Sequence, residues 1–321
     1  MLKYILKRIL RSFITLFFIT TIVFSLLRLM PVEGYFSNFE KLTETQIKVG
    51  LAKQNLDKPL PVQLGIFYRN ILKGDFGLSN KYRSNYPVTK IIAEKAPLSV
   101  KMGLLAIALS LAAGLPLGIL MAHSSAGRLK LWDKAGTVFV VLVQAVPAAI
   151  YHLFILIYGT ELLGPALHIP TLFRESNGLT WILPVVSLSL GNTAYFALWL
   201  RRYMMDESTK DYITLARAKG LPSAKIFSRH IFRNAMVPLV QYIPTSILLT
   251  LVGSLYVESL YSIPGMGGLL VSVVKLQDNT MVQTLVLLFS TISIFGLLLG
   301  DIIMAALDPR ISLAGKEGAD R

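Results

Sequence analysis

The chain has 321 residues, of which 54% are hydrophobic and 16% charged, and its mean hydropathy is +0.59. A chain this apolar cannot bury all its hydrophobic side chains in one soluble core, so the composition indicates an integral membrane protein. The net charge of +14 does not indicate nucleic-acid binding, because the Lys and Arg residues flank apolar runs and form no single basic face with stacking aromatics. The absence of cysteine excludes disulfides, thiolate metal sites and cysteine nucleophiles.

Long uncharged runs recur along the chain. A helix needs roughly 20 apolar residues to cross a bilayer, so we expect an all-α, polytopic protein with six transmembrane helices. The basic residues before the first run also suit a signal peptide, but no small-x-small cleavage pattern follows, and we interpret the run as an uncleaved span. The expected spans are residues 9–30, 102–122, 135–160, 178–200, 234–257 and 279–300.

Basic residues near the spans predict the orientation. Lys3, Lys7, Arg8 and Arg11 precede the first span, and segment 201–233 holds eight basic against three acidic residues. Both therefore belong on the cytoplasmic side, and six crossings place both termini there. We expect a first span (1–31), an extracytoplasmic segment (32–96), a core of five helices with a cytoplasmic loop at 201–233 (97–307), and a cytoplasmic tail (308–321).

The spans contain few groups that do chemistry. No Asp, Glu, Lys or Arg lies near a span centre, where ion-coupled transporters keep such groups. Gln144, Asn192 and His152 are the strongest polar candidates; each either bonds a neighbouring helix or lines a pathway. The chain also lacks a phosphate-binding G-x-x-x-x-G-K-[ST] loop. If the protein is a pump, another protein supplies the energy.

The cytoplasmic loop predicts an elbow of two short helices. Residues 205–219 suit a helix that Gly220 ends, and Pro222 starts the next one. The second helix carries an apolar ridge, which suits a partner protein's groove, or equally an interfacial helix on anionic lipid. The ridge residues are Phe227, Ile231 and Ala235, and the basic flank is Lys225, Arg229 and Arg233.

Segment 211–221, followed by Arg229 and Pro238, resembles the coupling loop of permease subunits of bacterial ABC importers, in the dipeptide and oligopeptide branch. Further similar strings stand in the same order at 57–63, 74–77, 87–88, 114–118, 258–260, 264–267 and 308–310. The resemblance implies the type I ABC importer permease fold. It also implies that the elbow couples to ATPases through Thr214, Leu215, Ala216, Arg217, Ala218, Lys219, Gly220, Leu221, Pro222 and Arg229.

The chain departs from the family pattern in two places. Thr214, Leu215 and Ala216 stand where importers generally have Glu-Ala-Ala, and Pro238 comes later than the general spacing, as in the peptide branch. This favours peptides over sugars. Residues 31–34 read Pro-Val-Glu-Gly where the family commonly has Pro-Gly-Asp-Pro, so no contact is assigned to that turn. Nickel and metal-chelate importers share the permease type, so the cargo stays open.

The resemblance implies a complex in the bacterial cytoplasmic membrane. This chain pairs with a second, homologous permease, two ATPases that bind ATP and Mg dock on the elbows, and an extracytoplasmic binding protein delivers the ligand. The chain itself binds no cofactor or metal and is not an enzyme. Outside, Glu258, Pro264 and Gly265 lie in a turn-rich connection that is a candidate gate or docking surface, or simply a folded re-entrant turn. An ion-coupled secondary transporter, a channel and a scaffold are the other classes weighed.

Overall fold

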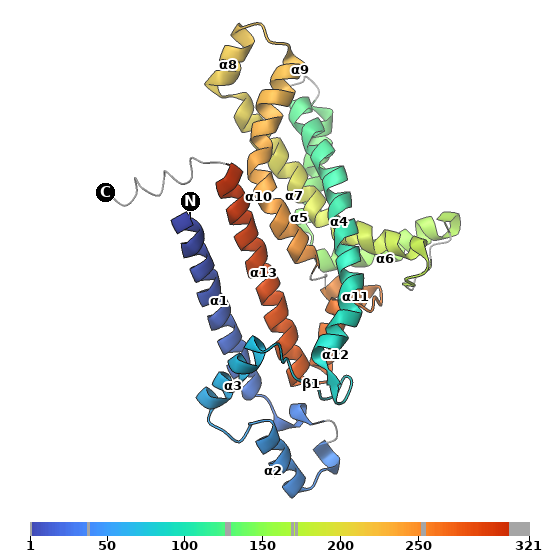
Figure 1. The fold of residues 1–321 in the computed structure, drawn as a ribbon. Coiled ribbons are helices and arrows are strands. Elements are labelled where there is room, and N and C mark those ends of the chain that lie inside the picture. The colour runs from blue at the N-terminus through green and yellow to red at the C-terminus, as the bar shows by residue number, and fades with distance from the viewer. Residues whose placement is uncertain are drawn as a thin grey trace.

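The computed structural model describes residues 2–36, 39–125, 130–167, 170, 173–251 and 255–307. Long helices run side by side through the middle of the molecule, an elbow lies at one end, and small helices of the N-terminal segment lie at the other (Figure 1). The long helices are α1 (Leu2–Arg28), α4 (Val88–Ser125), α7 (Ile182–Ser208), α10 (Arg233–Leu251) and α13 (Asn279–Leu307).

Shorter elements connect the long helices. Before α4 lie η1 (Val32–Tyr35), η2 (Phe39–Lys41), α2 (Glu44–Lys53), α3 (Leu60–Leu72) and the antiparallel strands β1 (Leu78–Ser79) and β2 (Tyr86–Pro87). The later elements are α5 (Leu131–Ala145), α6 (Ala148–Leu167), η3 (Gly178–Trp181), α8 (Asp211–Ala218), α9 (Ser223–Lys225), η4 (Ile226–Phe232), α11 (Leu255–Leu260) and α12 (Met266–Lys275).

The described residues give fewer straight spans than the six expected. Four helical stretches are long and apolar enough to cross a membrane: Leu6–Arg28, Val88–Ser125, Gly178–Ser208 and Asn279–Ile303. The bent pair α5 and α6 would make a fifth. α10 does not reach the same criterion within its described residues, and the expected span at 234–257 includes residues 252–254, which lie outside the described part.

The expected straight helix over 135–160 is wrong. α5 ends at Ala145, and α6 leaves it at an angle of 109°, projecting sideways from the bundle (Figure 1). Val146 is extended, with φ −85° and ψ 129°, and Pro147 follows it. Proline has no N–H to donate and disfavours helical backbone in the residue before it, so the helix breaks at this dipeptide.

α4 extends beyond its expected span in both directions. It has 38 residues, and Pro97 and Pro116 lie inside it without ending it. At 1.5 Å per residue the helix is about 57 Å long, longer than a bilayer is thick, so part of it stands outside the hydrocarbon. The boundary expected at residue 96 therefore falls within a continuous helix. The expected tail 308–321 lies outside the described residues.

Glycines let the central helices approach closely within the chain. A Cβ on Gly114 or Gly118 of α4 would lie 2.8 Å from the carbonyl oxygen of Thr193 or Ala197 on α7. A Cβ on Gly300 of α13 would lie 2.8 Å from the carbonyl oxygen of Gln241 on α10. Small residues bring membrane helices together in this way. Gly114, Gly118 and Gly300 therefore allow close helix packing inside this chain.

The segment between α1 and α4 is fastened to the long helices at two places. Tyr68 of α3 lies with its hydroxyl 2.8 Å from the Thr20 and Thr21 hydroxyls of α1. Asp278, just before α13, is fully buried, and its Oδ2 accepts hydrogen bonds from the Ser79 hydroxyl and from the backbone N–H groups of three consecutive residues. Those residues are Asn80, Lys81 and Tyr82. Segment 78–82 is thereby fixed to the start of α13.

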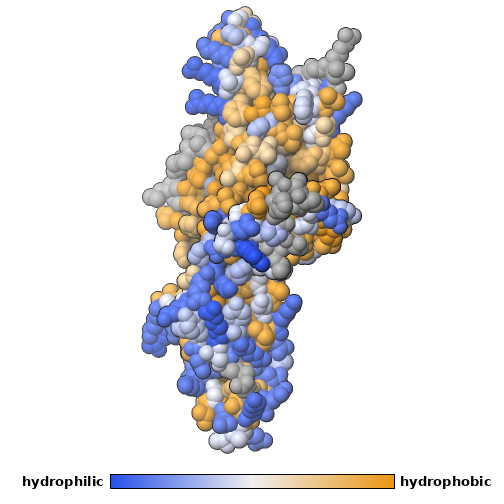
Figure 2. Space-filling model, turned by 90° about the vertical axis from the view of Figure 1, so that its right-hand side faces the viewer, coloured by the Kyte–Doolittle hydropathy of each residue, from blue (hydrophilic) through white to orange (hydrophobic). Residues whose placement is uncertain are grey.

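The surface divides by polarity along the long axis. Figure 2 shows a hydrophobic band across the middle of one face, between a hydrophilic elbow end and a more hydrophilic opposite end. Many large apolar side chains of α1 are exposed, among them Phe13 at 66% and Phe18 at 58%. Lipid solvates such surfaces in membrane proteins, so this pattern agrees with a bilayer around the middle of the molecule.

Candidate functional site

The elbow follows from two residues that stop helices. Gly220 has φ +73°, a left-handed conformation that ends α8, and Pro222 stands immediately before α9 with φ −58°. Both features confirm the expected bend. The expected continuous helix over 205–219 is wrong, however, because α7 ends at Ser208 and α8 begins only at Asp211. The Lys210 backbone between them is extended, so α8 is free to take its own direction.

Most residues expected to couple to a partner lie on the elbow surface. Ala216 is 6% exposed and packs inward with Ile213, and Leu221 is half-buried. Leu215 is 55% exposed although it is a large apolar side chain. The other exposed members of the expected set are Thr214, Arg217, Ala218, Lys219, Gly220, Pro222 and Arg229. The elbow thus presents a mixed apolar and basic surface around α8.

The apolar ridge expected to enter a partner's groove is buried within this chain. Ile231 is 6% exposed and Ala235 is 1% exposed, and both belong to a core cluster with Leu200 and Met204 of α7. Phe227 packs partly buried against the same cluster. Helical periodicity identifies an apolar face but not its partner, and here the partners are helices of this chain, α4, α7 and α8. The basic flank stays outside, with Lys225, Arg229 and Arg233 exposed.

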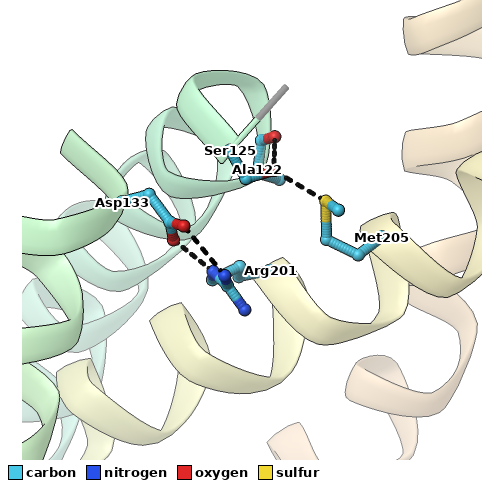
Figure 3. A network of polar contacts seen from close by, with 5 residues as sticks. All are labelled: Ala122, Ser125, Asp133, Arg201 and Met205. Carbon is cyan, nitrogen blue, oxygen red and sulfur yellow. Dashed lines mark hydrogen bonds and ion pairs between the residues drawn. The ribbon is translucent and has the colours of Figure 1, made fainter. Parts of the chain in front are cut away.

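Ion pairs and hydrogen bonds fasten the base of the elbow (Figure 3). Arg201 of α7 forms a two-bond ion pair with Asp133 of α5, with Nη2 2.9 Å from Oδ2. One helical turn further, the Ser125 hydroxyl at the end of α4 donates to the Met205 sulfur at 2.8 Å. These contacts join α4, α5 and α7 just before the chain enters the elbow. No spacing in the sequence connects Asp133 with Arg201, which lies 68 residues later.

Within the elbow, Tyr212 connects α8 to both neighbouring helices. Its hydroxyl donates to the Glu207 carboxylate at the end of α7 and accepts from the Asn234 amide of α10 at 2.8 Å. Burial, with a contribution from Glu207, raises the pKa of the Tyr212 hydroxyl. The phenol therefore stays neutral at cellular pH and keeps both hydrogen bonds.

A cleft lies behind the elbow. Its volume is about 720 Å³, and its walls come from the ends of α4 and α7 and from the elbow segments. Met204, Ile226 and Phe227 form apolar parts of the wall, and His123 and Arg217 also face it. The elbow is therefore not packed solidly against the bundle on this side.

At the opposite end, Glu258 caps the start of α12. It is 1% exposed; Oε1 accepts from the Ser99 hydroxyl at 2.8 Å, and Oε2 accepts from the Gly267 and Gly268 N–H groups at 2.7 and 3.2 Å. Ser99 in turn accepts from the Met266 N–H at 2.8 Å. The first N–H groups of a helix have no partner inside it, and here a carboxylate and a hydroxyl supply one.

Burial raises the pKa of Glu258, although these hydrogen bonds act to lower it. Gly265 is required beside this carboxylate, because an added Cβ would lie 2.5 Å from Oε2. Glu258, Pro264 and Gly265 also line one cavity of about 390 Å³. The structure thus brings these three expected residues together. Ser99 was missed, since a single serine in an apolar helix gives no signal.

The other expected pathway residues do not line that cavity. Gln144 of α5 is exposed, and Asn192 of α7 donates to the Thr250 hydroxyl on α10 at 3.4 Å. Asn192 thus bonds a neighbouring helix, one of the two roles expected for it. His152 on α6 is 6% exposed and its Nδ1 has no hydrogen-bond partner within the described residues. Among the described residues no three His, Asp or Glu side chains cluster as metal ligands.

Fold and elbow together define a class: a multi-pass helical membrane protein with a bent loop at one end. Residues 114–313 match the family described as binding-protein-dependent transport system inner membrane component, and residues 1–103 match the N-terminal part described for such membrane components. The chain belongs to this family of ABC importer permeases. It is therefore a non-catalytic membrane component of a transport system, located in the cytoplasmic membrane.

Relatives match over nearly the whole chain. The dipeptide transport system permease protein DppB of Lactococcus lactis is 34% identical over 314 residues, covering 98% of this chain and 100% of the relative. The oligopeptide transport system permease protein OppB of Haemophilus influenzae is 32% identical, covering 97% and 99%. The oligopeptide transport system permease protein AmiC of Streptococcus pneumoniae is 38% identical over 239 residues, covering 73% of this chain and 45% of the relative.

Proposed function

We propose that this chain is the transmembrane permease of an ATP-driven importer that carries dipeptides or oligopeptides across the cytoplasmic membrane. Family membership supports the transport role, and relatives whose names specify dipeptide or oligopeptide transport support the cargo. None of these names supports nickel or a metal chelate as cargo. An ion-coupled secondary transporter does not fit the family.

The proposed complex contains a second homologous permease, two ATPases that bind ATP and Mg, and an extracytoplasmic peptide-binding protein. The basic N-terminus and the basic elbow support a cytoplasmic location for both termini and for the elbow. The segment 32–96 then faces the binding protein, and the spans after it form the core. ATP binding brings the ATPases together, moves the elbows and opens the spans outward, and hydrolysis resets them.

The exposed surface of α8 carries this proposal. Leu215 is 55% exposed on α8, which lies at the elbow end of the molecule, beyond the apolar band. Arg217 and Lys219 lie exposed near it and suit an acidic rim around a partner's groove. The cleft of about 720 Å³ behind the elbow leaves room for it to move relative to the bundle.

In the same proposal, the residues of the turn before α12 position that helix. Glu258 and Gly265 hold the start of α12 beside the cavity of about 390 Å³, and Pro264 is exposed at its rim. We assign this turn to the outer gate, because fixing α12 there lets it move as one body with α11. Gln144 and Asn192 remain proposed pathway residues on α5 and α7.

Replacing the apolar Leu215 by a charged residue tests the docking assignment. Leu215→Glu places a carboxylate in the apolar centre of the proposed contact and should abolish ATPase association and peptide uptake while membrane insertion continues. Leu72→Glu is the matched control, since Leu72 is 87% exposed at the opposite end of the molecule. Co-purification of the ATPases with each variant measures the effect. Normal ATPase association by Leu215→Glu would contradict the assignment.

A further inference from the structure

A small polar cavity lies at the end of the bundle opposite the elbow. Its volume is about 150 Å³, and it is enclosed by the end of α1, by α3, by the turn before β1 and by the start of α13. The proposed transport mechanism uses none of its residues. Arg28, Gln63, Asp75 and Gln283 line it from these four elements.

Several polar atoms at this cavity have no partner. Arg28 Nε, Gln63 Oε1 and Gln283 Nε2 are buried and make no hydrogen bond. The Gln283 side chain is part of a residue only 9% exposed, so solvent does not satisfy it freely. Leaving a buried donor or acceptor unpaired destabilises the folded protein. Three such atoms around one cavity indicate that a polar ligand completes the site.

The charges around the cavity are separated. The Arg28 guanidinium lies over the rings of Phe24 and Tyr35, at 4.5 and 4.9 Å from their centroids, and it pairs with no carboxylate of the described residues. Asp75 uses Oδ1 to accept from the Gly77 N–H at 2.9 Å and forms no ion pair in the same described part. Donors therefore lie on the α1 and α13 side, and acceptors lie on the α3 side.

A narrow crevice continues from the cavity along the bundle. Phe67 and Gln283 line both spaces. The crevice then runs between α1 and α13, with Ile19, Val23 and Leu287 among its apolar walls. From residue 28 to residue 19, α1 covers about 14 Å at 1.5 Å per residue. The crevice has a volume of only about 10 Å³, so the polar cavity ends there and an acyl chain does not fit between the two helices.

We propose that this cavity binds the headgroup of a membrane phospholipid that carries phosphoethanolamine. The phosphate lies against Arg28 and Gln283, and the ammonium group lies against Asp75 and Gln63. The acyl chains lie outside the cavity, along exposed apolar side chains of α1 such as Ile22 and Leu26. This arrangement supplies an acceptor to Arg28 Nε and to Gln283 Nε2, and it supplies donors to Gln63 Oε1 and to the Asp75 carboxylate.

A peptide also carries both charges, but the cavity favours the lipid. Ligand cavities usually have about 300–1,000 Å³, at least twice the volume of about 150 Å³ found here. Arg28 is also the last residue of the first span, the level at which phospholipid headgroups meet a membrane helix. The bound lipid would fill the space between α1, α3 and α13 and stabilise the attachment of α1 to the bundle.

The test uses the full chain, purified with its co-expressed partner subunits, stripped of lipid and offered equal amounts of phosphatidylethanolamine and phosphatidylglycerol. Native mass spectrometry should show retention of phosphatidylethanolamine by the unaltered chain. Arg28→Gln should lower that retention about tenfold, as expected for losing a hydrogen bond to a charged group. Asp75→Asn should remove the preference for phosphatidylethanolamine over phosphatidylglycerol.

Arg69→Gln is the matched control, because Arg69 is an exposed arginine of α3 that does not line the cavity; its lipid retention should not change. If Arg28→Gln fails to assemble, Gln283→Leu replaces it with the same expected loss. Equal retention by unaltered chain and variants would overturn the proposal. Displacement of the lipid by a dipeptide or by inorganic phosphate, or retention of no lipid by the unaltered chain, would overturn it as well.

Discussion

The elbow and the opposite end of the molecule use their carboxylates differently. Near the elbow, Asp133 binds the side chain of Arg201 and Glu207 binds the side chain of Tyr212. At the opposite end, Asp278 and Glu258 accept backbone N–H groups of segments 80–82 and 267–268. Long side chains can follow a moving partner, whereas a carboxylate bound to several backbone groups fixes two segments together. The comparison indicates that the end opposite the elbow is fastened through its backbone, whereas the elbow is held by side-chain contacts that can adjust.

Asp278→Ala should give the largest loss of stability. It removes the acceptor of four backbone N–H groups, those of residues 80, 81, 82 and 281, and of the Ser79 hydroxyl, and it separates segment 78–82 from α13. We expect a loss of about 3–5 kcal/mol, because several buried donors lose their acceptor and each one left unpaired costs about 1–3 kcal/mol. Thermal unfolding of the purified complex measures it. Asp57→Ala, at an exposed aspartate, is the control and should leave unfolding unchanged.

Gly118→Val should cost less, about 1–3 kcal/mol, as overpacking does in a filled core. The added Cβ would lie 2.8 Å from the Ala197 carbonyl oxygen and force α4 away from α7. Gly65→Val, at a helical glycine of α3 with no atom within 4 Å of its Cβ, tests the same replacement in open space. Equal unfolding temperatures for the two variants would contradict the close contact between α4 and α7.

Asp133→Asn should have the smallest effect on stability, about 1 kcal/mol, because the ion pair is only partly buried, with side-chain exposures of 29% and 12%. The effect of this variant on the coupling of ATP hydrolysis to transport should be larger than its effect on stability. If the pair transmits elbow motion from α7 to α5, the variant should hydrolyse ATP with less peptide carried per ATP. Simultaneous ATPase and uptake measurements give that ratio. An unchanged ratio would restrict the pair to a structural role.

The elbow bend was predictable because its cause is local. Gly220 and Pro222 act through their own backbone geometry, so the sequence alone indicates where α8 ends and α9 begins. The break at Pro147 had a local signal too, but the uninterrupted apolar run around it favoured one straight span. Hydrophobicity reports burial in lipid or protein and does not report helix direction.

Contacts between distant segments were not predictable. Asp278 binds Ser79, which lies 199 residues earlier in the chain, and Glu258 binds Ser99, which lies 159 residues earlier. No spacing rule connects such positions. The prediction that the ridge of Ile231 and Ala235 enters a partner's groove was wrong for a related reason. The periodicity of the ridge is the same whether it packs within this chain or against another protein.

The most direct test of the central claim is site-specific crosslinking at the elbow. The chain contains no cysteine, so Lys219→Cys introduces a single reactive thiol on an exposed position, and Leu72→Cys introduces one at the opposite end. During peptide import, Lys219→Cys should crosslink to an ATPase and resist membrane-impermeant reagents added outside, while Leu72→Cys should react with them. Labelling of Lys219→Cys from outside, or crosslinks to lipid alone during import, would contradict the account.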